Sequence, residues 1–281
     1  MTATESGTFR GVGDVPIHWQ RSTPGSRPRG VVLLAHGYAE HLGRYDAFVG
    51  HLLGRGLAAA AIDHRGHGRS GGPRGHCLDF AELVADLRAL ADRAAEWWPD
   101  APRVLFGHSM GGLIALLYLL RHPSTVRAGA LSAPALRVRD AGPRGLRWVA
   151  QVLGRVAPRT AFTTRLDARA LSRDPAVGAA YVSDPLVHRR ATAGFVRALE
   201  AAQAIVRLEA DRLAVPLLVL QGDADRIVDP AAAAELAARL RAPHELVMLP
   251  GYYHELLNEP LAERARVLEL LDAWIDRWLA G

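Results

Sequence analysis

The sequence predicts an α/β fold, in which a mostly parallel eight-stranded sheet carries helices on both faces and an inserted helical cap. Two observations support this prediction. Short apolar runs alternate along the chain with longer stretches at helical spacing, as in parallel sheets with crossover helices. Most of these runs are continuously apolar, as expected of strands that are covered on both faces. With 281 residues, 49% of them hydrophobic, the chain is long enough for one large core.

The predicted strands begin with a hairpin, in which Thr8–Val12 pairs with Pro16–Ser22 across a turn at Gly13 and Asp14. The other strands of the predicted sheet are near-continuous apolar runs. They are Val31–Ala35, Leu57–Ile62, Val104–Phe106, Ala128–Leu131, Val215–Leu220 and Leu246–Leu249.

Apolar residues at helical spacing predict helices between these strands and after the last one. They are Arg44–Arg55, Phe80–Trp97, Gly111–Arg121, Ala231–Arg241 and Leu261–Leu279. Between Ala135 and about Ala210 no strand pattern is convincing, and helical patterns alternate with loops. We therefore expect a core made of residues 1–134 and 211–281, with residues 135–210 inserted as a helical cap or lid.

Charge and composition argue against several kinds of partner. All 34 basic side chains are arginines, and the formal net charge is +5. The arginines are scattered, with no basic run interleaved with aromatic residues, so nucleic acid is not an expected partner. The single cysteine, Cys77, excludes an internal disulfide. No metal-binding pattern or nucleotide-binding loop is recognisable, so no cofactor is expected.

The expected location is the cytoplasm. The first ten residues lack a basic segment followed by an apolar stretch, as a secretion signal would have. The run Leu113–Leu120 is far shorter than the roughly 20 residues of a membrane span. An apolar stripe in the cap, formed by Leu146, Val149, Ala150, Leu153 and Val156, would suit transient contact with a membrane surface. The same stripe would suit packing over a site equally well.

The most informative stretch is Gly107–Gly111, which reads G-H-S-M-G and lies between a predicted strand and a predicted helix. Such a sharp turn lifts the hydroxyl of the central serine clear of the sheet, and the flanking glycines leave room for the turn. The following helix points free N–H groups at the place where an oxyanion forms. These features predict an α/β-hydrolase fold with Ser109 as the nucleophile.

In this fold an acid and then a histidine follow the nucleophile along the chain. The loop after the strand at 215–220 offers three aspartates. Asp229 precedes a proline and a predicted helix, which is typical of an N-cap. Asp223 directly follows a glycine and would suit a turn. Asp225 is therefore the favoured acid, and Asp223 is the alternative.

The base should follow the next strand, and His254 does so. His244 lies at the other end of that strand, and the remaining histidines precede Asp225. His254 is expected to take the Ser109 proton, while Asp225 fixes the tautomer of the imidazole. Two backbone N–H groups should stabilise the oxyanion, one from Met110 after the nucleophile and one from Tyr38 in the loop after the third strand.

This loop, residues 36–45 with the sequence HGYAEHLGRY, resembles the oxyanion loop of the monoacylglycerol lipase family. The likeness extends over nearly the whole chain. It includes Asp63–Ser70, Gly107–Gly112, Ser132–Pro134, Leu171–Arg173, Ser183–Leu186, Gln221–Arg226 and Tyr253–His254. The nucleophile motif alone would indicate only the superfamily, whereas the oxyanion loop and the motifs in the insert are more specific to the family.

The resemblance implies hydrolysis of a monoacylglycerol to a fatty acid and glycerol, with Asp225 as the acid. It also implies a mobile amphipathic cap over an apolar acyl tunnel, and a glycerol end lined by Glu40 and Arg44. From the residues alone, the favoured interpretation of Glu40 and Arg44 is a local ion pair that holds the loop. The chain departs from the family at Leu257, where mammalian members carry a second histidine.

The expected partner is a small lipid ester, and no obligatory protein partner is evident. Lysophospholipases, general carboxylesterases and acyltransferases use the same triad and are the alternative functions. A non-catalytic ligand receptor on the hydrolase scaffold is a further alternative, which an intact triad disfavours.

Overall fold

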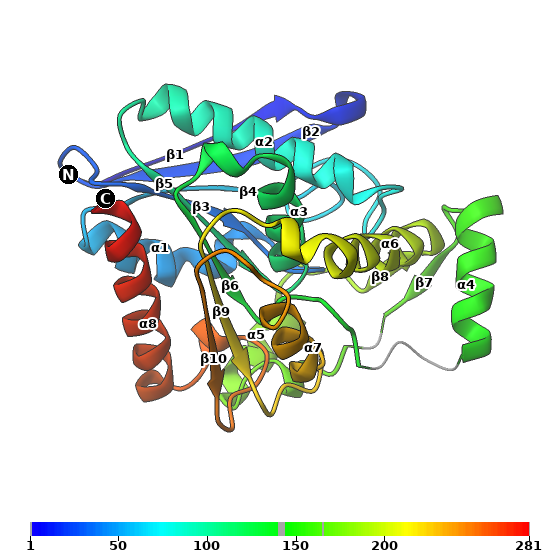
Figure 1. The fold of residues 1–281 in the computed structure, drawn as a ribbon. Coiled ribbons are helices and arrows are strands. Elements are labelled where there is room, and N and C mark those ends of the chain that lie inside the picture. The colour runs from blue at the N-terminus through cyan, green and yellow to red at the C-terminus, as the bar shows by residue number, and fades with distance from the viewer. Residues whose placement is uncertain (1, 140–143, 165, 281) are drawn as a thin grey trace.

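The computed structural model describes residues 2–139, 144–164 and 166–280, although within 144–150 only the side chain of Val149 is described. In this part of the chain eight strands form one sheet (Figure 1). They are β1 (Ala3–Arg10), β2 (Pro16–Thr23), β3 (Val31–Ala35), β4 (Ala58–Ile62), β5 (Arg103–His108), β6 (Ala128–Ser132), β9 (Leu217–Gly222) and β10 (His244–Leu249).

The strand order across this sheet is β1-β2-β4-β3-β5-β6-β9-β10. β2 runs antiparallel to both of its neighbours, and all other neighbouring pairs are parallel. The predicted mostly parallel eight-stranded sheet and its N-terminal hairpin are therefore confirmed. Because β5, β6, β9 and β10 are parallel neighbours, the loops that follow them leave the sheet at the same edge.

Helices cover both faces of the sheet (Figure 1). On one face lie α2 (Phe80–Trp97), α3 (Met110–Arg121), α6 (Ala193–Glu209) and α7 (Pro230–Ala237), and on the other lie α1 (Asp46–Gly54) and α8 (Leu261–Leu279). Short 3-10 helices are η1 (Val12–Asp14), η2 (Leu42–Tyr45), η3 (Pro123–Thr125), η4 (Ala168–Ala170), η5 (Ala210–Arg212) and η6 (Leu256–Asn258).

The two hydrophobic clusters explain why the central strands are apolar without alternation. In β3, Val31 and Leu33 enter the cluster beneath α2 and α3. Val32 and Leu34 enter the other cluster, beneath α1 and α8. All four side chains are fully buried. A strand with helices on both faces must therefore be apolar at every position.

Between β6 and β9 the chain leaves the sheet and forms the insert. It contains α4 (Arg144–Val156), β7 (Ala161–Thr163), α5 (Pro175–Ser183), β8 (Arg190–Thr192) and α6. α4 lies at the outer edge of the molecule, beyond the end of α6 (Figure 1). The expectation of no strand in this segment was wrong, because β7 and β8 pair antiparallel. Each is three residues long, which is too short for alternation to reveal it.

No helix among the described residues combines the length and the apolar character that crossing a membrane requires.

A buried ion pair joins the loop after β4 to α2 and also contacts the N-terminal hairpin. Arg65 donates to both carboxylate oxygens of Asp86, at 2.7 and 2.9 Å. Arg65 also donates to the carbonyl of Val12, and Asp86 accepts the Val12 N–H. The Asp86 side chain is fully buried. If the guanidinium were removed, this carboxylate would remain buried without a cation, which is strongly unfavourable.

We expect Arg65→Met to lower the free energy of unfolding by about 3–5 kcal/mol for this reason. Urea denaturation followed by tryptophan fluorescence measures the change. Arg266→Met is a matched control, because the Arg266–Glu269 pair is exposed and is expected to contribute less than about 1 kcal/mol. A similar loss of stability in both variants would contradict the role assigned to Arg65.

Candidate active site

Ser109 lies in the sharp turn between β5 and α3. Its backbone has φ +52° and ψ −117°, a combination that non-glycine residues rarely adopt. A Cβ atom on Gly107 would lie 2.4 Å from the carbonyl oxygen of Gly111, and one on Gly111 would lie 2.0 Å from that of Ala35. The turn therefore requires glycine at both positions, and the serine between them carries the backbone strain.

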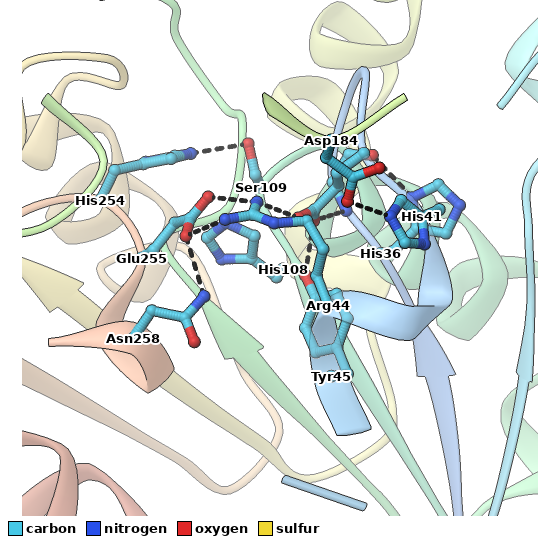
Figure 2. A network of polar contacts seen from close by, with 12 residues as sticks. His36, His41, Arg44, Tyr45, His108, Ser109, Asp184, His254, Glu255 and Asn258 are labelled. Atoms are coloured by element: carbon cyan, nitrogen blue, oxygen red, sulfur yellow. Dashed lines mark hydrogen bonds and ion pairs between the residues drawn. The ribbon is translucent and has the colours of Figure 1, made fainter. Parts of the chain in front are cut away.

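His254 and Asp225 reach Ser109 from the loops that follow two neighbouring strands, β10 and β9. The His254 Nε2 atom is 2.9 Å from the Ser109 Oγ atom (Figure 2), and Nδ1 is 2.7 Å from Asp225 Oδ2. All three residues are buried. The structure thus brings together the three residues that the sequence proposed as nucleophile, acid and base.

The three aspartates after β9 have different surroundings. Asp225 is fully buried and accepts two backbone N–H groups in addition to its contact with His254. Asp223, the alternative acid, is exposed and accepts a backbone N–H from the loop after β10. Asp229 caps α7, as its position before a proline predicted. Of the three, Asp225 is the one that contacts the imidazole.

Burial and pairing act in opposite directions on the two titrating groups. Burial lowers the pKa of His254, but the Asp225 carboxylate, and then Glu255 and Glu40, raise it above the ordinary value of 6.5. Burial raises the pKa of Asp225, but His254 and the backbone N–H donors hold it below its ordinary value. Asp225 therefore remains ionised, as the partner of an imidazolium must be.

The loop after β3, called the oxyanion loop (residues 36–45), lies against the nucleophile. A Cβ atom on Gly37 would be 3.3 Å from the Cβ of Ser109. Tyr38 and Met110 both line the cavity at Ser109. No acceptor among the described residues takes the Tyr38 N–H. Met110 is the first residue of α3, so its N–H has no partner within the helix. Both N–H groups are therefore available to an oxyanion.

Glu40 and Arg44 form a buried charged group with a third residue, Glu255. Arg44 donates to Glu40 at 2.7 Å and to both oxygens of Glu255 at 2.6 and 2.8 Å (Figure 2). The other oxygen of Glu40 accepts the Gly37 N–H at 2.5 Å and the Tyr45 hydroxyl at 2.6 Å. Burial raises the pKa of Glu40, but Arg44, the neighbouring histidines and the Tyr45 hydroxyl together outweigh it and lower the pKa to about 2. The group thus joins the oxyanion loop to the residue beside His254.

Sequence reasoning missed Glu255 and the contact of buried His108 with His254. Glu255 directly follows His254, but nothing in the local sequence indicates that its partner is Arg44. The His108 ring packs against the His254 ring at an interplanar angle of 56°, with centroids 4.8 Å apart. Burial and the neighbouring His254 lower the pKa of His108 to about 4, so this ring stays neutral near pH 7.

A cavity of about 730 Å³ opens over Ser109. Part of its wall is apolar and comes largely from the insert. Residues of this wall include Phe162, Leu171, Phe195, Val196, Leu199 and Ile227. Glu40, Arg44 and Glu255 form a polar part of the wall. The cavity therefore suits a molecule that joins an apolar chain to a small polar group. Among the described residues, no cluster of His, Cys, Asp or Glu side chains is arranged to hold a metal ion.

Known proteins are similar to this chain over most of its length. A family model described as serine aminopeptidase, S33, matches residues 26–261. A monoacylglycerol lipase of Mycolicibacterium smegmatis is 45% identical over 95% of both chains. A monoglyceride lipase of Mus musculus is 33% identical over 92% of this chain and 86% of the relative. The crystal structure of Paleococcus ferrophilus monoacylglycerol lipase has a TM-score of 0.81 at 32% identity and covers 92% of this chain and 97% of that one.

We expect the His254 imidazole to titrate above pH 6.5 in the unmodified protein and below it in Asp225→Asn. Loss of the carboxylate leaves burial, which lowers the pKa, as the dominant influence. NMR titration of ¹⁵N-histidine-labelled protein measures this. Asp223→Asn is the control, because the Asp223 carboxylate belongs to the same loop but does not contact the imidazole. An unchanged His254 pKa in Asp225→Asn would refute the pairing.

Proposed function

Because the chain belongs to the monoacylglycerol lipase family of the α/β-hydrolase superfamily, we propose that it hydrolyses monoacylglycerols to a fatty acid and glycerol. The observation that carries the proposal is the hydrogen-bonded series of Ser109, His254 and Asp225 at the base of a cavity with an apolar and a polar wall. Relatives named as lipases of this substrate, aligned over most of the chain, support it.

In the proposed mechanism His254 Nε2 takes the proton of Ser109 as the serine oxygen attacks the ester carbonyl. The backbone N–H groups of Tyr38 and Met110 stabilise the oxyanion, and Asp225 stabilises the imidazolium. The imidazolium then gives its proton to the leaving glycerol oxygen, so the acyl group remains on Ser109. Water attacks this ester with His254 again as base, and the fatty acid leaves.

We assign the two walls of the cavity to the two ends of the substrate. The apolar wall takes the acyl chain, and Glu40 and Arg44 face the glycerol end. Arg44 uses three of its five N–H donors on Glu40 and Glu255, so two donors remain for glycerol hydroxyls. The ion pair and the substrate contact are thus compatible roles for the same residues.

We further propose that residues 135–210 form the cap and that residues 1–134 and 211–281 form the core. We also propose that the protein is cytoplasmic and that its cap contacts membranes transiently. Val149, Val156 and Phe162 are exposed, by 42, 74 and 38%, although they are large and apolar. Exposed Arg155 lies beside Val156, and such a mixture suits an anionic lipid surface. The side chains of Leu146 and Ala150, which complete the predicted stripe with partly buried Leu153, lie outside the described residues.

We expect Ser109→Ala to lower the turnover of p-nitrophenyl butyrate by on the order of 10⁶, because the acyl-enzyme can no longer form. Release of p-nitrophenol measures turnover, and thermal unfolding checks that the fold is intact. Ser183→Ala, which removes an exposed hydroxyl from α5, is expected to keep full activity. Turnover by a folded Ser109→Ala protein close to that of the unmodified enzyme would exclude the mechanism.

We expect faster hydrolysis of monoacylglycerols than of di- or triacylglycerols with the same acyl chain. The polar wall offers charged groups to free glycerol hydroxyls, and a second acyl chain would have to be buried against them. Fatty acid release from matched glycerides and lysophospholipids measures the preference. Equal rates on the three glycerides, or a clear preference for lysophospholipids, would contradict the proposed substrate.

A further inference from the structure

The oxyanion loop is also held by the insert, through residues that have no role in the mechanism above. The contacting part of the insert begins at Asp184, directly after α5, and is called the insert turn (residues 184–190). Asp184 lies beside His41 of the oxyanion loop, away from Ser109 and His254 (Figure 2). Neither residue is among the described residues that line the cavity.

Asp184 uses its two carboxylate oxygens for two different contacts. Oδ1 accepts the Leu186 N–H at 2.8 Å, which closes the insert turn. Oδ2 is 2.8 Å from His41 Nε2. Burial raises the pKa of Asp184, but the hydrogen bonds from His41 and Leu186 outweigh it and keep the pKa below its ordinary value. Asp184 is therefore an ionised acceptor that joins its own turn to the oxyanion loop.

His41 is engaged at both ring nitrogens. Its Nδ1 accepts the Gly43 N–H at 3.2 Å and thereby caps η2. In the neutral ring the proton is then on Nε2, which donates it to Asp184. The His41 side chain is 11% exposed and that of Asp184 is 25% exposed, so water competes weakly for this contact. The imidazole thus has one preferred tautomer and one orientation.

Two more hydrogen bonds join the same segments. The His188 N–H donates to the carbonyl of Ala39 at 3.1 Å, and the Tyr38 hydroxyl donates to the carbonyl of Arg190 at 2.6 Å. Ala39 has φ +67°, which is unfavourable for a residue with a side chain. A strained backbone persists only when its surroundings hold it in place. Here the strained residue directly follows Tyr38, the proposed donor to the oxyanion.

We propose that Asp184 and His41 are positioning residues, through which the insert holds the Tyr38 N–H in the place where it stabilises the oxyanion. This inference rests on the proposed hydrolase function. The core restrains the same loop through Glu255, which accepts from Arg44, while Glu40 accepts the Gly37 N–H within the loop. A displaced donor weakens binding of the transition state more than binding of the substrate. Loss of the link to Asp184 therefore lowers kcat and leaves KM nearly unchanged.

Asp184→Asn tests this role, and Asp174→Asn is its matched control. Both aspartates precede a proline in the insert, and each accepts the N–H of the residue two positions further on. Only Asp184 reaches the oxyanion loop. In Asp184→Asn the amide oxygen can still accept the Leu186 N–H, but the amide nitrogen would face the His41 Nε2 proton. The turn is thus retained while the link to His41 is lost.

For Asp184→Asn we expect kcat on p-nitrophenyl butyrate to fall about 10- to 100-fold, less than the roughly 10²–10³ for complete loss of a donor. KM should stay within about twofold. Affinity for an alkyl trifluoromethyl ketone, which adds to Ser109 as a hemiketal oxyanion, should fall in parallel. Asp174→Asn should keep all three quantities within about twofold. Equal kcat and equal ketone affinity in the two variants would overturn the proposal.

His41→Asn separates positioning from a structural role. Asparagine keeps an oxygen near the place of Nδ1 for the Gly43 N–H but lacks the donor to Asp184. It should lower kcat and ketone affinity as Asp184→Asn does. The double variant should lower them no further than either single variant does. A lower melting temperature with unchanged kcat per folded molecule would instead show a structural role and overturn the proposal. The proposed function is tested separately, by ester turnover in the unmodified protein and its loss in Ser109→Ala. Ketone binding compares the Asp184 and His41 variants without relying on turnover.

Discussion

The hydrogen bond between His254 and Asp225 is the interaction on which the rest of the site depends. A fully buried carboxylate is unfavourable unless it is paired, and here the imidazole and two backbone N–H groups compensate for its burial. The pairing requires two loops that are distant from Ser109 in the sequence. Parallel packing of β5, β6, β9 and β10 brings these loops to one edge, so the sheet topology is a condition for the chemistry.

Much of the fold could be predicted because strands buried on both faces are continuously apolar and the helices that cover them carry apolar residues at helical spacing. The bounds of β3, α2 and α8 agree with the predicted ranges. Predictions were less accurate where these apolar patterns are weak. The helix expected at Ala231–Arg241 ends at Ala237, because its alanine-rich run carries no stop signal. The paired strands β7 and β8 are too short to show a period.

The same reasoning explains which site residues could be found. Ser109, Asp225 and His254 occupy positions that local sequence identifies, since each follows a strand in a known order. Glu255 and Asp184 do not, because their roles depend on partners far along the chain. Arg44 lies 211 residues from Glu255, and His41 lies 143 residues from Asp184. No periodicity or spacing in one segment predicts such a partner, so only the folded structure reveals these contacts.

The polar wall has a consequence for the products of the proposed reaction. Glu40 and Glu255 together carry one more negative charge than Arg44 neutralises, and both carboxylates are almost fully buried. Glycerol is neutral, whereas the fatty acid ionises once it is released. A newly formed anion beside this wall experiences a repulsion that the neutral ester does not. The charge distribution therefore weakens binding of the ionised acid and favours its departure from the active site.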